Sequence, residues 1–134
     1  MAVHGAQQKI HEAVLSWPRW ISGAGLIDLI KMFIQRGWSG VTAHPHRFGG
    51  TEYRLGKREL GHIHGDQVVD IPFPKKVRDK IIAAGRAEPH HVLPESGWIS
   101  FYLNESADID KAIGLFRQSF ELAEKQRSPK QGSE

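Results

Sequence analysis

The stretch TEYRLGKRELGHIHGDQVVDI, residues 51–71, decides the fold because its side chains alternate with the period of two that a β-strand requires. The dipeptides Gly56-Lys57 and Gly65-Asp66 divide it into three short segments and suit the two-residue loops of β-hairpins. The sequence therefore predicts three consecutive antiparallel strands, a β-meander.

Two-residue loops also fix which side chains share a face of the meander, since residue 55 then lies opposite residue 58, and residue 64 opposite residue 67. The mostly apolar face, which we expect under the helices, carries Tyr53, Leu55, Leu60, His62, His64, Val69 and Ile71. The other face carries Glu52, Arg54, Glu59, Gly61, Ile63, Val68 and Asp70. A shift of one residue in either register would reverse the assignment.

Helical periodicity flanks the meander on both sides. We predict a helical N-terminal region over residues 6–36 and a short helix over residues 75–84 that ends at Gly85. A strand rich in β-branched and aromatic residues is predicted at 97–103. A last helix follows, with one apolar stripe made of Ile109, Ala112, Ile113, Phe116, Phe120 and Ala123.

The predicted fold class is α+β, because the strands cluster instead of alternating with helices. We expect a two-layer sandwich in which helices cover one face of the antiparallel meander. Residues 1–124 form a single domain whose sheet begins at residue 38. Residues 125–134 are polar without an apolar period, so the sequence predicts a disordered tail there.

Composition excludes several classes of function. With 40% hydrophobic and 25% charged residues among 134, the chain has the composition of an ordinary globular domain. No apolar run approaches the ~20 residues that span a membrane, and the N-terminus lacks a secretory signal, so we expect a cytoplasmic location. The absence of cysteine excludes disulfides, thiolate nucleophiles and Cys-based zinc sites. Metal binding or acid–base chemistry therefore falls to His, Asp and Glu.

Histidines are the main candidates, since the chain has eight and six of them lie between residues 44 and 91. His62 and His64 project side by side from one strand, and AHPH at 43–46 and EPHH at 88–91 add two more pairs. Three interpretations stay open. The rings are packed with satisfied nitrogens, or His62 and His64 bind a metal ion together with one of His44, His46, His90 or His91, with Asp70 or Glu59 as a further ligand or supporting partner. Alternatively, one ring is a metal-free general base oriented by a carboxylate such as Asp70.

The segment KKVRDK, residues 75–80, offers a function of another kind. Its basic side chains and the open face of the sheet would form a binding module for nucleic acid or a protein, with Lys76 and Lys80 contacting phosphates. The acidic residues Glu52, Glu59 and Asp70 on that face oppose phosphate binding. Nucleic acid is therefore not expected as the partner.

Three blocks of sequence, in this order, resemble the luciferase-domain family, which is named after the fungal luciferases. They are HPHRFGGTEYRLGKRELGHIHGD at 44–66, VDIPFP at 69–74 and GRAEPHHVLPESGW at 85–98. The resemblance covers about residues 37–123, and the matching residues are His46, Arg47, Gly49, Glu52, Glu59, Gly61, His62, His64, Asp70, His90 and Trp98. A fainter likeness in fold is to the MmcQ/YjbR proteins of CyaY-like fold, which implies a sheet with one open face.

The family resemblance implies a monooxygenase pocket for a planar, enolic or phenolic, pyrone-like substrate that reacts with dioxygen without a metal or flavin, so no cofactor is expected. A histidine base would remove the enol proton, and an apolar enclosure would protect the peroxide from water. The implied catalytic residues are His62, His64, His90 and Asp70. The implied substrate-binding residues are His46, Arg47, Glu52, Tyr53, Glu59, His91 and Trp98. Light emission is not expected, because the sequence shows no membrane anchor of the fungal kind.

Overall fold

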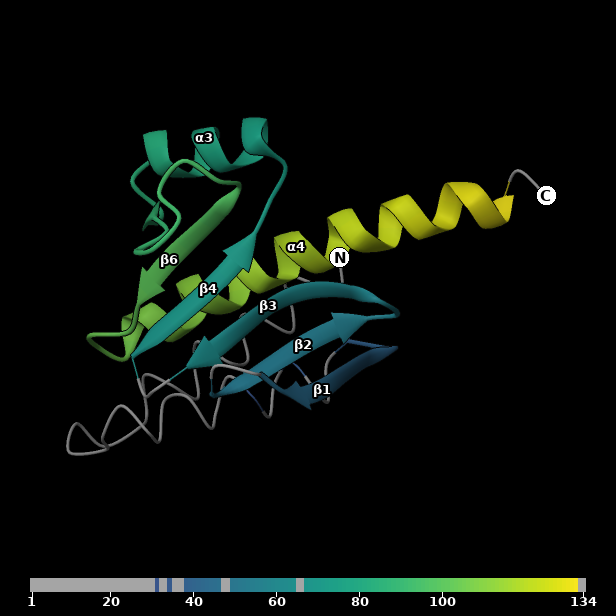
Figure 1. The fold of residues 1–134 in the computed structure, drawn as a ribbon, viewed down its shortest axis with the longest axis horizontal. Helices are drawn as coiled ribbons and strands as arrows, with labels where there is room; N and C mark the ends of the chain where they lie inside the picture. The colour runs from purple at the N-terminus through teal and green to yellow at the C-terminus, as the bar shows by residue number, and fades with distance from the viewer. Residues whose placement is uncertain (1–30, 32–33, 35–37, 47–48, 65–66, 133–134) are drawn as a thin grey trace.

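The computed structural model of the chain describes residues 31, 34, 38–46, 49–64 and 67–132. Its elements are β1 (Val41–Pro45), β2 (Thr51–Leu55), β3 (Arg58–His64), β4 (Val68–Pro72), α3 (Lys75–Ala83), β5 (Glu88–Pro89), β6 (Trp98–Tyr102) and α4 (Ala107–Gly132). The strands form one antiparallel sheet in the order β1-β2-β3-β4-β6-β5. The α+β prediction is therefore confirmed, and Figure 1 shows α4 running across one face of this sheet.

The hydrophobic core lies between α4 and the sheet. All six residues of the apolar stripe predicted for the last helix are buried. Phe116, in the middle of that stripe, is fully buried, and its ring meets the ring of Tyr53 edge-on with centroids 5.9 Å apart. Burying a side chain of this size stabilises the fold by roughly 1.5–3 kcal/mol. The sheet contributes apolar residues from its central strands: Tyr53, Leu55, Leu60, Ile63, Val69, Ile71, Ile99 and Phe101.

A β-bulge in β3 changes which of its side chains face α4. Tyr53 pairs with Gly61 and Arg54 pairs with Glu59, so Leu60 is the extra residue between the two pairs. Leu60 belongs to the core, and its carbonyl oxygen accepts a hydrogen bond from Ser119 Oγ of α4 at 2.8 Å. Because the bulge adds one residue, the side chains that follow it lie on the faces opposite to those predicted.

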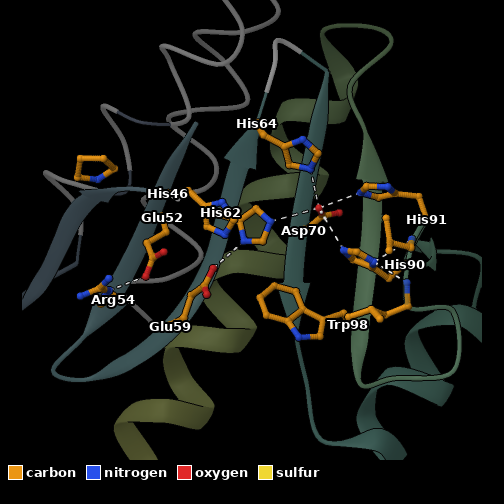
Figure 2. A pocket seen from close by; sticks show the side chains of 13 residues that line it. His46, Glu52, Arg54, Glu59, His62, His64, Asp70, His90, His91 and Trp98 are labelled. Atoms are coloured by element: carbon orange, nitrogen blue, oxygen red, sulfur yellow. Dashed lines mark hydrogen bonds and ion pairs between the residues drawn. The ribbon is translucent and has the colours of Figure 1, made fainter. Parts of the chain in front are cut away.

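The turn between β3 and β4 adds a second shift of one residue. The predicted pairing of residues 64 and 67 is wrong, since His64 pairs with Val68 and three residues separate the strands. The two shifts compensate for each other beyond His64, so Val69 lies on the core face as predicted. The errors are therefore confined to residues 61–64. His62 and His64 lie on the face away from α4 (Figure 2). Ile63 and Gly61, in contrast, lie against the core.

Other predicted elements are confirmed. The hairpin between β2 and β3 turns at Gly56 and Lys57, where Gly56 has φ +65°. The short helix α3 is followed by Gly85 with φ +72°, the left-handed conformation that terminates many helices. The strand predicted at 97–103 is β6.

Few residues are described near the N-terminus, and near the C-terminus the structure differs from the prediction. Most of the predicted helical region 6–36 lies outside the described residues, within which Lys31 and Ile34 are helical and Ile34 is fully buried. The structure continues α4 to Gly132, so residues 125–132 are helical where a disordered tail was predicted. Lys125 and Gln126 are good helix formers, and Gln126 Oε1 accepts a hydrogen bond from the Arg58 guanidinium. Among the described helices, none combines the length and apolarity that crossing a membrane would require.

Candidate functional site

The face of the sheet away from α4 carries a cavity of about 640 Å³. Figure 2 shows side chains from several strands and from the segment after β5 pointing toward one hollow, with α4 behind the sheet. The residues that line the cavity are Pro45, His46, Glu52, Arg54, Glu59, His62, His64, Asp70, His90, His91, Val92, Leu93 and Trp98. Histidines from three separate segments therefore meet in one place.

The strand register explains why these side chains converge. Cross-strand partners project on the same face of a sheet. Glu52 of β2 pairs with His62 of β3, His62 pairs with Asp70 of β4, and Asp70 pairs with Ser100 of β6. These four residues form a row across the sheet. The bulge at Leu60 is what turns His62 into this row.

The carboxylate of Asp70, only 1% exposed, is the centre of the cluster. Its Oδ1 accepts a hydrogen bond from Ser100 Oγ at 2.7 Å. Four imidazole nitrogens surround the other oxygen, Oδ2, as the dashed lines of Figure 2 show. The distances to Oδ2 are 2.6 Å from His64 Nε2, 3.1 Å from His91 Nε2, and 3.3 Å from both His62 Nε2 and His90 Nε2.

His62 lies between two carboxylates. Its Nδ1 is 2.7 Å from Glu59 Oε2, and its ring stacks on the ring of His46 with centroids 4.0 Å apart. Burial acts to lower the pKa of His62, but the hydrogen bonds and negative charges of Asp70 and Glu59 outweigh it and raise the pKa to about 9. Without another cation nearby, this imidazole is therefore positively charged at neutral pH.

The electrostatics of Asp70 complement those of His62. Burial acts to raise the pKa of Asp70, but hydrogen bonds from His62, Ser100, His64 and His91 hold that pKa well below its usual range. The carboxylate is thus ionised over the whole physiological range. A buried negative charge of this kind needs a cation or several donors beside it.

His90 has a different role from that of the other rings, because its Nδ1 is already occupied. The backbone N–H groups of Val92 and Leu93 donate to His90 Nδ1 at 3.1 and 3.0 Å. The neutral ring therefore carries its proton on Nε2, which faces Asp70. Burial lowers the pKa of His90, against the opposing influence of Asp70, so the neutral form is favoured. His90 shapes the segment that closes one side of the cavity.

The structure brings most of the sequence-predicted residues together. All four predicted catalytic residues line the cavity: His62, His64, His90 and Asp70. Five of the predicted substrate-binding residues also line it: His46, Glu52, Glu59, His91 and Trp98. Arg47 lies outside the described residues.

Two predicted residues lie elsewhere. Tyr53 is fully buried against Phe116 on the core face, so the structure removes it from the substrate-binding set. The reason is its pairing with Gly61, which faces α4. His44, predicted as a third metal ligand, does not line the cavity, and its Nε2 is 2.8 Å from Thr42 Oγ1. The predicted metal-ligand set of His62, His64 and His44 is therefore not brought together, because His44 lies outside the cavity.

Several residues of the site were missed. The Nε–H of Arg54 donates a hydrogen bond to Glu52 Oε2. Because the predicted register already placed Arg54 on the open face, the sequence could have indicated that it belongs to the site. Ser100 could have been found only from the pairing of β4 with β6. Val92 and Leu93, which line the cavity beside His90, had no periodicity that would signal a role.

The cluster has the ligand types and spacing of a metal site. Three groups each place their donor atoms within 4.8 Å of one another: His46, Glu59 and His62; His62, His64 and Asp70; and Asp70, His90 and His91. Imidazole and carboxylate ligands are those that divalent transition ions use in proteins. The cluster could therefore hold a metal ion, as well as donate and accept protons.

Fold and site together define an α+β domain with a histidine–carboxylate pocket on the open face of its sheet. Residues 57–119 of this chain match the family model described as Luciferase domain, which confirms the resemblance to the luciferase-domain family. The matched segment runs from the β2–β3 turn into α4 and includes His62, His64 and Asp70. No curated protein and no solved structure matches the chain. The likeness to the MmcQ/YjbR fold stays a prediction.

Proposed function

We propose that the cavity binds a planar small molecule with an acidic enol or phenol hydroxyl and promotes the reaction of that molecule with dioxygen. The observation that carries the proposal is the two-sided lining of the cavity. Imidazoles gather around the Asp70 carboxylate, and the same cavity is also lined by Val92, Leu93 and Trp98. An aromatic ring that carries one ionisable hydroxyl matches both sides.

The apolar side of the cavity fits the ring of such a substrate. Val92 and Leu93 are the two large hydrophobic residues that remain exposed in the described part of the chain, at 67% and 52%. Both line the cavity, together with Trp98, whose ring centroid lies 5.2 Å from that of His62. A flat ring lying against Trp98 would cover these apolar surfaces and bring its hydroxyl to the histidines. Exposed apolar groups beside a cavity are typical of ligand sites.

The polar side fits the chemistry of an enol. Loss of the hydroxyl proton leaves an electron-rich enolate, and the imidazoles around Asp70 supply both a proton acceptor and positive charge for the anion. We assign this contact to His62 and His64, with His90 and Asp70 holding the rings in place. Attack of the enolate carbon on dioxygen then forms a peroxide, which an apolar enclosure protects from water. The confirmed family match supports this class of substrate.

Ligand binding is tested by thermal shift and calorimetry with hydroxypyrones and catechols. The matched control ligands are their methyl ethers, which keep the ring but lack the ionisable hydroxyl. We expect the free hydroxyl compounds to raise the Tm and the ethers to have little effect. Trp98→Ala should abolish the shift, whereas His44→Ala, on the same sheet face but outside the cavity, should keep it. Equal shifts from ethers and hydroxyl compounds would contradict the proposal.

Oxygenation is tested separately with an oxygen electrode and mass spectrometry of the products. A ligand that binds should consume dioxygen in the presence of the protein and gain oxygen atoms from ¹⁸O₂. Binding without oxygen uptake across the ligand series would leave a binding protein and overturn the oxygenase assignment.

A further inference from the structure

We infer that His62, His64 and Asp70, whose donor atoms lie within 4.8 Å of one another, together bind one divalent first-row transition-metal ion inside this cavity. The first observation is the crowding around Asp70 Oδ2, which has four imidazole nitrogens within 3.3 Å. A carboxylate oxygen offers about two lone-pair positions for donors. Two rings, those of His64 and His91, are hydrogen-bonded to Oδ2, and the Nε2 atoms of His62 and His90 lie 3.3 Å from the same oxygen in addition. A cation shared by the oxygen and several nitrogens accounts for the arrangement.

The distances also suit ligands of a common ion. Metal–ligand bonds to imidazole nitrogen and carboxylate oxygen are about 2.0–2.2 Å, so neighbouring ligand atoms in tetrahedral or octahedral sites lie roughly 3–3.5 Å apart. From Asp70 Oδ2 to the Nε2 atoms of His62 and His64 the distances are 3.3 and 2.6 Å. Only the His64 pair would have to open, by a few tenths of an ångström.

The hydrogen bonds of His62 give a second, independent reason. Its Nδ1 lies 2.7 Å from Glu59 Oε2, so Nδ1 carries the proton and donates it to that carboxylate. In the neutral ring the lone pair of Nε2 then points at Asp70. A carboxylate that orients an imidazole whose other nitrogen meets a cation is the usual environment of histidine ligands.

The same reasoning excludes His90 from the ligand set. Two backbone N–H groups donate to its Nδ1, so its Nε2 keeps a hydrogen and cannot offer a lone pair to an ion. His90 instead donates that hydrogen toward Asp70 Oδ2, 3.3 Å away. Ser100 Oγ holds the other oxygen of the same carboxylate at 2.7 Å. The ion is thus bound by two nitrogens and one oxygen, while His91 Nε2 lies at hydrogen-bond distance, 3.1 Å, from Asp70 Oδ2.

This ligand set selects the kind of ion. Two imidazoles and one carboxylate favour Zn²⁺, Fe²⁺ or Co²⁺ over Mg²⁺ and Ca²⁺, which prefer oxygen ligands. His91 is about one-third exposed and His64 nearly so, so the ion would face the open cavity and could keep a water molecule or take a ligand oxygen. Catalytic metal sites have this open position, whereas structural sites are closed.

The inference rests on the ligand geometry and does not depend on the oxygenase proposal. As ligands, His62 and His64 would meet the substrate hydroxyl through the ion instead of as free bases. A bound ion would also make the expectation of no cofactor wrong.

The test uses the untagged full chain, stripped with EDTA and titrated with Zn²⁺, Fe²⁺ under anaerobic conditions, and Co²⁺. We expect about one ion per chain by elemental analysis after gel filtration, and the visible absorption of Co²⁺ bound to nitrogen ligands. Mg²⁺ should not compete. Less than a tenth of an equivalent of any of these ions would overturn the inference.

Variants separate a specific site from adventitious binding. His64→Ala and Asp70→Asn should lose the ion, while His44→Ala, a matched histidine outside the cavity, should keep it. Glu59→Gln should weaken binding by about 10–100-fold, because it replaces the charged carboxylate that orients His62 by a neutral amide, a weaker acceptor. Circular dichroism of each stripped variant checks its fold, and His62→Ala provides a second ligand test if Asp70→Asn does not fold. Equal loading of His64→Ala and the parent chain would contradict the site.

The two proposals fail in different ways. If stripped protein binds hydroxypyrones but takes up no ion, the ligand proposal stands and the metal site is wrong. If the ion binds at about one per chain and no hydroxyl compound does, the metal site stands without that substrate class.

Discussion

The two faces of the sheet use the same strands and have opposite chemistry. On the face toward α4, Ile63, Val69 and Ile71 are buried among apolar side chains. On the other face, their neighbours His62 and Asp70 join a network of imidazoles and carboxylates. The apolar face stabilises the fold, whereas the polar face stays available for a ligand. Segregation of this kind is expected when helices cover a single side of an antiparallel sheet.

The difference between the faces depends on one extra residue. Without the bulge at Leu60, strict alternation would send His62 and His64 into the core and Ile63 into the cavity. Gly61 makes the bulge possible, because it has φ +154° and lies where a Cβ would be 2.8 Å from Phe116 Cε1. The assignment of the histidines to the open face is thus secured by core packing on the other side of the same strand.

The largest expected effect comes from the apolar face. Phe116→Ala should destabilise the fold by about 3–5 kcal/mol, because it leaves a cavity between α4 and the bulge. His64→Ala, whose side chain is 31% exposed on the other face, should change the free energy of unfolding by less than about 1 kcal/mol in EDTA. Urea denaturation of both variants measures the contrast. Similar losses from the two substitutions would contradict the division of roles between the faces.

An intermediate effect is expected at the bulge itself. Gly61→Ala should cost about 2–4 kcal/mol, since the new Cβ approaches Phe116, the Asp70 carbonyl oxygen and Ile71 within 3.0 Å. The matched control is Gly56→Ala, where φ is +65° but no atom lies within 4 Å of the new Cβ. That variant should lose only about 1 kcal/mol, from backbone strain alone. The difference between their urea midpoints isolates the steric contribution. Equal losses would show that the tight contact at Gly61 does not control the bulge.

The sequence predicted the strands and the fold class, because these follow from local periodicity and turn residues, whereas most residues assigned to the site came from the resemblance to the luciferase-domain family. It could not predict the bulge. A glycine within a strand is compatible with either a regular or a bulged pairing, and what favours the bulge is Phe116, 55 residues further along the chain. The length of the turn after His64 was misjudged for a similar reason: Gly65-Asp66 suits a two-residue loop, and only pairing across the sheet shows that Gln67 also belongs to the turn.

The convergence of the histidines was likewise beyond local pattern. His90 and His91 reach Asp70 because β5 pairs with the far side of β6, a long-range contact. The sequence suggested histidine pairs in three segments without indicating that one carboxylate collects them. Tyr53 shows the opposite error. It was assigned to the substrate-binding residues, but its ring contributes to the core and not to the cavity.

The smallest effect on stability is expected at the rim of the cavity. A substitution there should change ligand binding much more than it changes the free energy of unfolding. Val92 is 67% exposed, so Val92→Ser should change the free energy of unfolding by less than about 0.5 kcal/mol. If the ring of a bound hydroxypyrone covers this side chain, the same substitution should weaken binding by about 1–2 kcal/mol, or roughly 5–30-fold in Kd. Val92→Ile keeps the apolar surface and serves as the matched control, with unchanged or tighter binding in calorimetry.

The result at Val92 distinguishes a ligand surface from an incidental apolar patch. A stability-neutral variant with weakened binding would mean that the open face is kept for a ligand at the cost of exposed hydrophobic surface. Unchanged affinity in Val92→Ser would contradict contact between the ring and this edge. Recognition of the ligand would then depend on the polar cluster around Asp70. The comparison between hydroxypyrones and their methyl ethers would be the measurement that tests this recognition.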